Sequence, residues 1–520
     1  MVGTKTVDKD LKRFTLIEKA GQQAGRQNVK LGLGLFFILG VWAYLSLQAG
    51  SGEGELFVVV AGVIGAYMAL NIGANDVANN VGPAVGSAAL SMTGALIIAS
   101  VFEASGAILA GSDVVSTIRK GIIDPDGMAS AAVFTWAMMA ALLAAAIWIN
   151  LATWVGAPVS TTHSIVGGVM GAGIAAAGWY AVNWVTMTKI AASWVISPVL
   201  GGLVAAGFLA VIKFMIVYQD DKVAAAKRWV PILVAVMAAA FSSYLVMKGL
   251  KNIWKPSGPM IGLIAVASFG IAWYLVRIWV SRAAVGLENR RKSVSTLFTV
   301  PLICSAAMLS FAHGANDVAN AVGPLAAIVG SVYSGEIVSK VAVPYWVLVI
   351  GAIGISAGLV LYGPKLIKTV GSKITKLDRM RAFTVALSAS ITVIVASALG
   401  LPVSSTHIAV GAVFGVGFFR EWLVNRRKAN LVLAASADAG ASVAGWGPDE
   451  QISAQTAEDL GLKLAKKEKK AKKKLKKAAK KKLVRRSHFL TIITAWLVTV
   501  PLAALLSAMI FYAIKGILTP

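Results

Sequence analysis

A short polar segment occurs twice in this chain, each time at the end of a long apolar run. Gly73–Pro83 reads Gly-Ala-Asn-Asp-Val-Ala-Asn-Asn-Val-Gly-Pro, and Gly314–Pro324 repeats it with a single change. Ionisable groups in apolar surroundings are costly, and they persist mainly where they handle ions or polar cargo. The duplication therefore favours a fold in which two similar halves each bring a carboxylate into an apolar interior.

A second motif, rich in hydroxyl groups, is also duplicated. Ala157–His163 reads Ala-Pro-Val-Ser-Thr-Thr-His, and Leu401–His407 reads Leu-Pro-Val-Ser-Ser-Thr-His. Each copy follows the Asn-Asp motif of its half, 84 residues later in the first half (position 76 to 160) and 87 later in the second (317 to 404). Two halves that carry the same pair of motifs are typical of transporters built from internal repeats.

The composition places these motifs in a membrane. The chain is 57% hydrophobic with a mean hydropathy of +0.75, and 14% of its residues are charged, against about 25% in soluble domains. Its apolar runs of 18 or more residues are long enough to cross a bilayer, and a span must satisfy its own backbone hydrogen bonds by forming a helix. We therefore predict an all-α polytopic membrane protein with two inverted repeats, broken or re-entrant helices, and roughly 11–13 membrane segments.

The predicted organisation follows the apolar runs. The segments 157–180 and 402–419 are rich in glycine, and we expect them to form re-entrant or broken helices rather than full crossings. Acidic residues precede the first Asn-Asp helix and basic residues precede the second, so the positive-inside bias predicts that the two helices enter from opposite faces. The expected divisions are a polar cytoplasmic tail at 1–30, an extra span with an acidic loop at 31–55, transport repeat 1 at 56–217, connecting spans with a basic loop at 218–296, the first part of repeat 2 at 297–429, a polar lysine-rich insert at 430–487, and a final span at 488–520.

The net charge of +26 is concentrated in one segment. Between Lys463 and Arg486 there are fifteen lysines and arginines and one acid, Glu468. A basic segment joined to a membrane span indicates a cytoplasmic location and affinity for anionic lipid, and it favours these over RNA binding. We expect no nucleic-acid partner and a multi-pass location in the plasma (inner) membrane. Because Cys304 is the only cysteine, the chain cannot form an intrachain disulfide, and we expect the thiol to be buried.

The hydroxyl motifs predict an anion site. Proline favours the start of a helix, hydroxyl side chains cap its free N–H groups, and a helix N-terminus attracts anions. Two such ends that face one another would surround a tetrahedral oxyanion, whereas a single copy would favour plain helix capping. The predicted anion-binding residues are Ser160, Thr161, Thr162, Ser404, Ser405 and Thr406.

The Asn-Asp motifs predict cation sites. An anion could not lie against two ionised aspartates without compensation, because like charges repel strongly at low dielectric. Hard cations take carboxylate, amide and backbone oxygens, and the neighbouring glycines and prolines permit broken helices that expose carbonyls. A purely structural Asp–Asn network is the alternative. The predicted ligands are Asn75, Asp76, Asn79, Asn316, Asp317 and Asn320, with Na⁺ at Asp76 and Asp317.

Three further polar residues lie in apolar sequence. Glu103 stands alone between Ile97 and Leu109, which indicates a role in ion coupling or, alternatively, at a polar interface between helices. His163 and His407 each end a hydroxyl motif. A histidine could carry a proton there, but we favour histidines that orient the turn.

These motifs resemble those of the PiT inorganic phosphate transporters, and so does Thr117–Asp124, which reads Thr-Ile-Arg-Lys-Gly-Ile-Ile-Asp. The likeness covers about 56–217 and 297–515. The resemblance implies an inverted-repeat helical fold, phosphate between the paired hydroxyl motifs, and cations at the paired Asn-Asp motifs. Members of that family carry phosphate with Na⁺ or with H⁺, and the wording Asp-Val-Ala-Asn is closer to the Na⁺-coupled members.

The sequence therefore predicts a secondary transporter that takes up inorganic phosphate in symport with Na⁺, by alternating access around a site near the middle of the membrane. Coupling to H⁺, transport of a metal–phosphate complex or of another oxyanion, and a phosphate sensor that does not transport are the alternatives. We predict no enzymatic activity and no cofactor, with Na⁺ as the co-transported ion. Homo-oligomerisation stays open.

Overall fold

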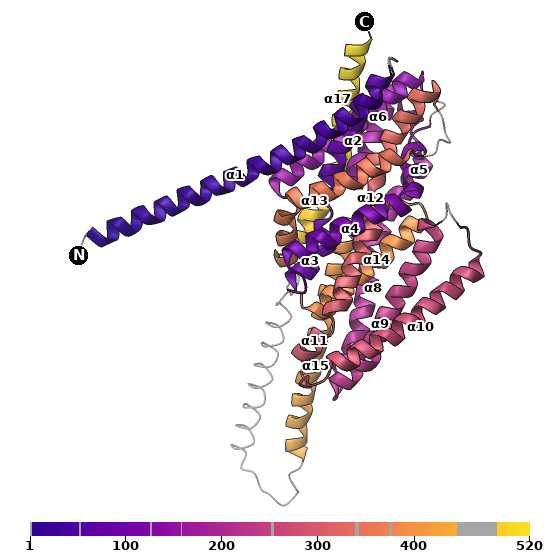
Figure 1. The fold of residues 1–520 in the computed structure, drawn as a ribbon. Helices are drawn as coiled ribbons and strands as arrows, with labels where there is room; N and C mark the ends of the chain where they lie inside the picture. Colours follow the sequence, from indigo (N-terminus) through magenta and orange to yellow (C-terminus); the bar gives the residue numbers. More distant parts are fainter. Residues whose placement is uncertain are drawn as a thin grey trace, which may run out of the picture.

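The computed structural model describes the chain except residues 1–2, 51, 53, 125–126, 158, 251–253, 338–342, 374–376, 445–485 and 520. Its described residues form a helical bundle (Figure 1). In chain order the helices are α1 (Gly3–Gln48), α2 (Glu55–Asn75), α3 (Ala78–Gly86), α4 (Met92–Ala110), α5 (Ser112–Lys120), α6 (Ala131–Val155), α7 (Thr161–Ala177), α8 (Trp184–Ile212), α9 (Lys222–Tyr244), α10 (Gly258–Ala283), α11 (Arg291–Thr296), α12 (Thr299–Ser334), α13 (Tyr345–Lys373), α14 (Arg379–Ala398), α15 (Ser405–Ala444) and α17 (Arg486–Leu518).

Twelve helical segments of the described chain are long and apolar enough to cross a membrane, within the predicted range. They satisfy their backbone hydrogen bonds internally, as hydrocarbon surroundings require. The polar residues 3–30 are helical and continuous with the first span, because α1 runs without interruption from Gly3 to Gln48; it projects from the bundle (Figure 1).

The two glycine-rich segments differ from one another. In the first, α7 has 17 residues and is too short to count among the spans, in agreement with the predicted re-entrant or broken helix. In the second, α15 continues for 40 residues, and Ser405–Arg426 is long enough to cross. The helix that begins in the segment 402–419 therefore does not end there, because the polar sequence after residue 419 prolongs the helix rather than ending it.

The two Asn-Asp motifs also differ in backbone. In the first half the chain breaks between α2 and α3, at Asp76 and Val77. In the second half α12 runs through Asp317 and Pro324 as one helix. The break that we expected in both halves is thus present only in the first, since the glycines of the second motif permit a break without requiring one.

The two motif segments cross the bundle in opposite directions. At one end Tyr333, near the end of α12, donates a hydrogen bond to Glu55 at the start of α2 (3.3 Å). At the other end Arg379 donates to both Thr299, which begins α12 (3.0 Å), and the backbone of Ala88, which follows α3 (3.2 Å). This antiparallel arrangement is the one that inverted repeats require.

Helices of the two halves interleave rather than forming separate bodies. Helix α2 packs on α13 as α12 packs on α4, and α7 packs on α17 as α15 packs on α8. Each contact is matched by one in which the halves are exchanged. Glycines allow the closest approaches: a Cβ added at Gly73 would lie 1.8 Å from the backbone oxygen of Ile355, and one at Gly314 would lie 2.1 Å from that of Glu103.

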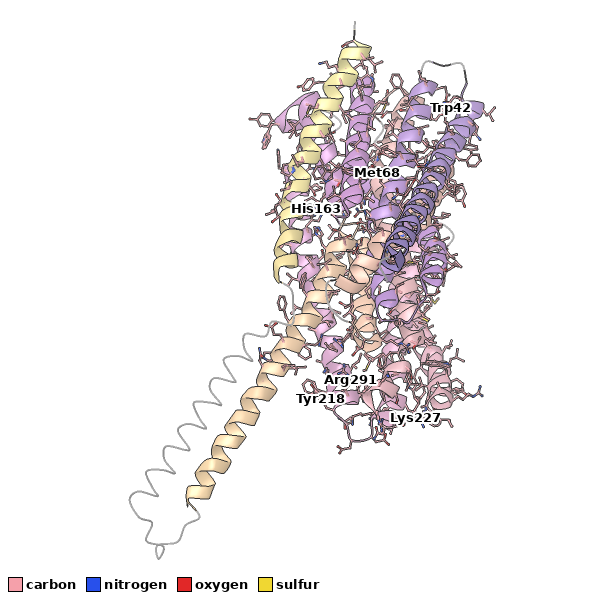
Figure 2. All side chains as sticks on the ribbon, turned by 90° about the vertical axis from the view of Figure 1, so that its left-hand side faces the viewer. Trp42, Met68, His163, Tyr218, Lys227 and Arg291 are labelled. Carbon is pink, nitrogen blue, oxygen red and sulfur yellow. The ribbon has the colours of Figure 1, made fainter. Side chains whose placement is uncertain are left out.

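Several basic residues lie at one end of the bundle. Figure 2 labels Lys227, Arg291 and Tyr218 at this end, with Trp42 at the other and His163 at mid-height. Positive charge marks the cytoplasmic end of a membrane protein. Cys304, expected to be buried, is exposed on α12. An apolar run does not by itself tell which face of a helix meets lipid.

Candidate functional site

The hydroxyl motifs form the beginnings of α7 and α15, and these two ends meet inside the bundle. Ser160 accepts a hydrogen bond from the backbone N–H of His163 (3.1 Å), and Ser404 accepts one from that of His407 (3.2 Å). Both serines therefore act as helix caps. The hydroxyl of Thr162 donates to the backbone oxygen of Val403 (3.1 Å), which joins one helix start to the loop before the other.

The remaining hydroxyl groups turn toward the two aspartates. Thr161 Oγ1 donates to Asp76 Oδ2 at 2.6 Å and lies 3.3 Å from Asp317 Oδ2. Thr406 donates to Asp76 Oδ1 (2.7 Å), and Ser405 donates to Asp317 Oδ2 (3.3 Å). All five side chains are at most 1% exposed. The residues that the sequence divides between an anion site and a cation site thus belong to one buried cluster.

The later asparagine of each Asn-Asp motif contacts the hydroxyl motif of the other half. Asn79 Nδ2 donates to Thr406 (2.8 Å), and Asn320 Nδ2 lies within reach of Thr161 (3.1 Å) and Thr162 (3.2 Å). Asn79 Oδ1 is buried and accepts no hydrogen bond within the described part of the chain. A buried carbonyl oxygen without a donor is suited to coordinate a cation.

The first asparagine of each motif holds a loop instead. Asn75 Nδ2 donates to Thr153 (2.9 Å) and to the backbone of Ala157 (3.2 Å), while its Oδ1 accepts from the N–H of Val159 (3.2 Å). Asn316 lies in the corresponding way against Ser397 (2.9 Å). These two asparagines position the loops that precede the hydroxyl motifs, and their side chains are already used there.

Glu103 is completely buried, and it is linked to the cluster through a residue that the sequence analysis did not single out. Its carboxylate accepts from Asn80 Nδ2 (2.7 Å) and lies 2.7 Å from Nδ1 of His313. The other ring nitrogen, Nε2, lies 3.1 Å from Asp317 Oδ2. His313 precedes Asp317 by one helical turn, and this i,i+4 spacing on one helix face was the available signal.

The charge of the cluster requires positive compensation. Asp76, Asp317 and Glu103 are three carboxyl groups with at most 1% exposure, and His313 is the one basic side chain that contacts them within the described residues. Ligand atoms of Asp76, His313 and Asp317 lie within 4.8 Å of one another. Buried charges are tolerated when they are paired or hold a cation. The donor set therefore fits a cation.

His163 and His407 lie behind the cluster. Their rings meet edge to face with centroids 4.3 Å apart, and the ring of His163 lies 3.8 Å from that of Trp194. Both backbone N–H groups belong to the helix caps described above, so the two histidines form part of the helix starts. We find their side chains packed between α7, α8 and α15 rather than against the aspartates.

A helical bundle of this kind, with carboxylates, amides and hydroxyls converging at its centre, defines a polytopic membrane transporter rather than an enzyme. The chain belongs to the phosphate transporter family, whose sequence model matches residues 72–507. This confirms the resemblance drawn from the motifs, and the protein is a phosphate transporter of that family.

Similar proteins cover most of the chain. A protein of Helicobacter pylori strain J99, provisionally named a phosphate permease, is 49% identical over 97% of this chain and 98% of its own length. A protein of Thermococcus kodakarensis with the same provisional name is 39% identical over 70% of this chain and 89% of its own. The solved structure described as the sodium-dependent phosphate transporter has 34% identity and a TM-score of 0.74, and the match covers 89% of this chain and all of that one.

Proposed function

We propose that this protein takes up inorganic phosphate in symport with Na⁺, by alternating access around the buried cluster. The observation that carries the proposal is the meeting of Asp76 and Asp317 at the hydroxyl of Thr161, between the starts of α7 and α15. This arrangement combines cation ligands with the N-terminal helix ends that attract anions. The sodium dependence named for the similar solved structure supports the choice of ion.

In this proposal the carboxylates hold Na⁺. Asp76, Asp317 and the buried oxygen of Asn79 are the main ligands, and Asn320 supports them from the other half. Asn75 and Asn316, which the motif pattern also assigned to the cation, act mainly by fixing the two loops. Glu103 contributes through His313, which holds the carboxylate of Asp317 in place.

Phosphate binds at the two helix starts, where Thr161, Thr162, Ser405 and Thr406 supply hydroxyl donors, and the caps Ser160 and Ser404 orient the backbone N–H groups. The same hydroxyls contact the carboxylates, so phosphate and ionised aspartates compete for them. Two uncompensated carboxylates would repel phosphate strongly in a buried site. Na⁺ removes this repulsion, which is the physical basis of coupling.

The test is phosphate uptake into proteoliposomes at fixed pH, with external Na⁺ or with choline in its place. Symport predicts accumulation against a gradient in Na⁺ and a loss of accumulation in choline. Undiminished uptake in choline would overturn Na⁺ coupling. No accumulation in either medium, with phosphate binding retained, would instead indicate a sensor. Competition by sulfate and arsenate would define the range of oxyanions.

Proton coupling is a second candidate, and one contact favours it. Glu103 and His313 form a buried pair at 2.7 Å beside Asp317, and such pairs can carry protons. Accumulation in choline that is driven by an inward pH gradient, and abolished by a protonophore, would support H⁺ coupling. Accumulation that follows the Na⁺ gradient at equal pH on both sides would exclude it.

The surroundings of the transporter are part of the proposal. We place it in the plasma (inner) membrane, with the basic end in the cytoplasm. The lysine-rich insert is expected to contact anionic lipid there, although residues 445–485 lie outside the part of the chain that the structure describes. The assignment of 56–217 and 297–515 to two transport repeats, and the open question of homo-oligomerisation, belong to the same proposal.

A further inference from the structure

A large cavity behind the transport cluster lies between two pairs of helices, α7 with α17 and α8 with α15. Its volume is about 1020 Å³, and its walls come from α8, α15 and α17. The cavity extends from the rings of His163 and His407 to the aromatic side chains of Phe418 and Trp422 on α15. Figure 2 labels His163 at mid-height of the bundle. This volume is at the upper end of the range for ligand sites in proteins.

The lining of the cavity is suited to hydrocarbon rather than to phosphate. Apart from the two imidazoles, it consists of aliphatic, glycine, proline and aromatic residues, and the indole N–H of Trp194 already donates to the backbone of Pro402 (3.2 Å). Several lining residues face outward, with Val199 58% and Leu203 64% exposed. In a bilayer these faces meet lipid, so the cavity opens sideways into the membrane.

The cavity also lies at an interface between two helix pairs, which we call the seam. Helix α17 packs on α7 at one side, and α8 packs on α15 at the other. The two helix starts that carry the hydroxyl motifs belong to different sides of this seam, and they touch through His163 and His407. Whatever fills the cavity therefore supports the relative position of the two hydroxyl motifs.

A basic side chain lies beside one end of the cavity. The guanidinium of Arg426 lies 5.3 Å above the ring of the lining residue Trp422, and Arg427 and Lys428 follow it in the sequence. An anionic headgroup would meet positive charge there. The lysine-rich insert joins α15 to α17 and carries too much positive charge to enter an apolar cavity.

We propose that the cavity binds an acyl chain of an anionic phospholipid whose headgroup contacts Arg426. The hydrocarbon fills the space between α8, α15 and α17 and supports the seam behind the hydroxyl motifs. The site is separate from the phosphate and Na⁺ site, and its occupancy does not depend on the coupling ion. Anionic lipid is thus a bound component of the transporter at this site.

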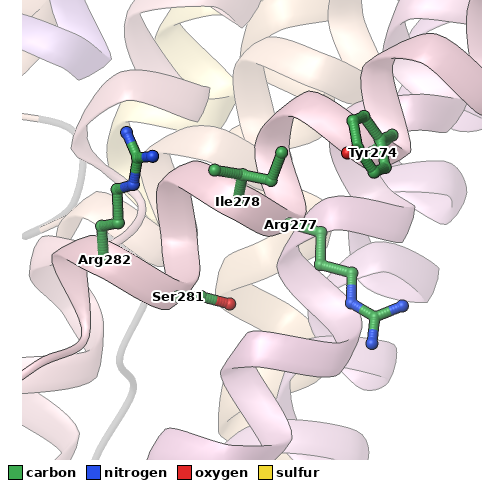
Figure 3. Close-up of a pocket in the computed structure, with 5 residues that line it drawn as sticks. All are labelled: Tyr274, Arg277, Ile278, Ser281 and Arg282. Atoms are coloured by element: carbon green, nitrogen blue, oxygen red, sulfur yellow. The ribbon is translucent and has the colours of Figure 1, made fainter.

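The chain offers a matched control on α10. Arg277 lies 5.0 Å above the ring of Trp273, which repeats the geometry of Arg426 and Trp422. Arg277 lines a pocket of about 320 Å³ with Tyr274, Ile278, Ser281 and Arg282, all from α10 (Figure 3). This pocket has a similar charge but lies along a single helix, without a deep apolar cavity behind it.

The experiment measures the phospholipid that remains on the purified full chain. The purified protein is transferred into mixed micelles of detergent and phosphatidylcholine that contain a small share of phosphatidylglycerol. The lipid that the protein retains is then identified by native mass spectrometry. The wild type should retain phosphatidylglycerol in preference to phosphatidylcholine. Arg426→Gln should lower that preference about fivefold, and Val199→Trp, which fills the cavity, should abolish retention of either lipid.

The control variants are Arg277→Gln and Val266→Trp, both on α10, and they should retain lipid as the wild type does. Equal losses in the control and cavity variants would overturn the proposal, as would retention of lipid by Val199→Trp with unchanged preference. A cysteine introduced by Leu203→Cys in a Cys304→Ser background should not cross-link two chains in the membrane. Efficient cross-linking between copies would show that a second copy covers the cavity, and would also overturn the proposal.

Discussion

The hydroxyl of Thr161 offers the sharpest test of the proposed site, because both aspartates meet there. Its hydrogen bond to Asp76 Oδ2 is 2.6 Å long, which is the length expected for a hydroxyl that donates to a carboxylate. Thr161→Val keeps the shape of the side chain and removes the donor. The substitution leaves the helix cap at Ser160 in place.

The expected magnitude follows from the hydrogen bond that this hydroxyl donates to the charged phosphate in the proposed bound state. A hydrogen bond to a charged group contributes about 1.5–3 kcal/mol, and each 1.4 kcal/mol corresponds to a factor of ten. Thr161→Val should therefore raise the apparent phosphate KM roughly 10- to 150-fold. The apparent Na⁺ requirement should change less, because the carboxylates remain. Thr161→Ser retains the donor and should stay close to the wild type.

The assay is uptake of labelled phosphate into proteoliposomes, titrated with phosphate at saturating Na⁺ and with Na⁺ at saturating phosphate. Ser405→Ala is an internal comparison, because its hydroxyl lies 3.3 Å from Asp317 Oδ2 and should contribute less. Thermal unfolding of each variant checks that the fold is intact. A changed Na⁺ requirement with unchanged phosphate KM would refute the assignment and interchange the two roles.

Three further outcomes follow from the same contacts. Asp76→Asn and Asp317→Asn should each abolish Na⁺-driven uptake while folded protein stays in the membrane, because the amide keeps the shape and loses the charge; normal uptake across a range of Na⁺ concentrations would contradict this. Glu103→Leu should lower the free energy of unfolding by about 3–5 kcal/mol, because it removes one of the two carboxylates that His313 contacts. Adding His313→Leu should recover part of the loss in thermal unfolding, and equal loss in both variants would count against a paired charge. Partial burial tends to raise the pKa of Asp378, but hydrogen bonds and charge from neighbouring arginines outweigh it and hold the pKa below its usual value of about 3.9. Its contribution to stability should be present above about pH 4 and disappear as the pH falls through the lowered pKa. The difference in the free energy of unfolding between the wild type and Asp378→Ala should therefore be constant from about pH 5 to 8 and should decrease toward zero at lower pH.

Much of the fold could be predicted from the apolar runs, because length and hydropathy determine which segments cross a bilayer. The backbone of α12 at Asp317 and the length of α15 could not. A glycine permits a break without requiring one, and a polar sequence after Trp422 can continue a helix into water as readily as it can end one. Neighbouring helices decide both cases, and the sequence does not state which helices are neighbours.

The site shows the same limit. The two motifs identified Asp76, Asp317 and the hydroxyl groups of Thr161 and Ser405, but they suggested separate anion and cation clusters. The interleaved packing of the two halves brings these residues into one cluster. His313 was missed because its spacing of one helical turn from Asp317 is a weak signal within an apolar run. Aligning the two halves would have found it, since Ile72 stands at the matching position.

The mismatch between His313 and Ile72 affects the relative free energies of the two access states. Gly73 approaches the backbone of Ile355 as Gly314 approaches that of Glu103, so Glu103 occupies the position that Ile355 has in the other half. The surroundings of Asp317 thus include a charged pair, Glu103 with His313, whereas the matching positions near Asp76 are Ile355 and Ile72. In transporters with inverted repeats, exchanging the conformations of the two halves converts one access state into the other. Identical halves would give the two states equal free energy. The charged pair beside Asp317 removes this equality, so the two proposed cation sites should differ in affinity even though their motifs are nearly identical.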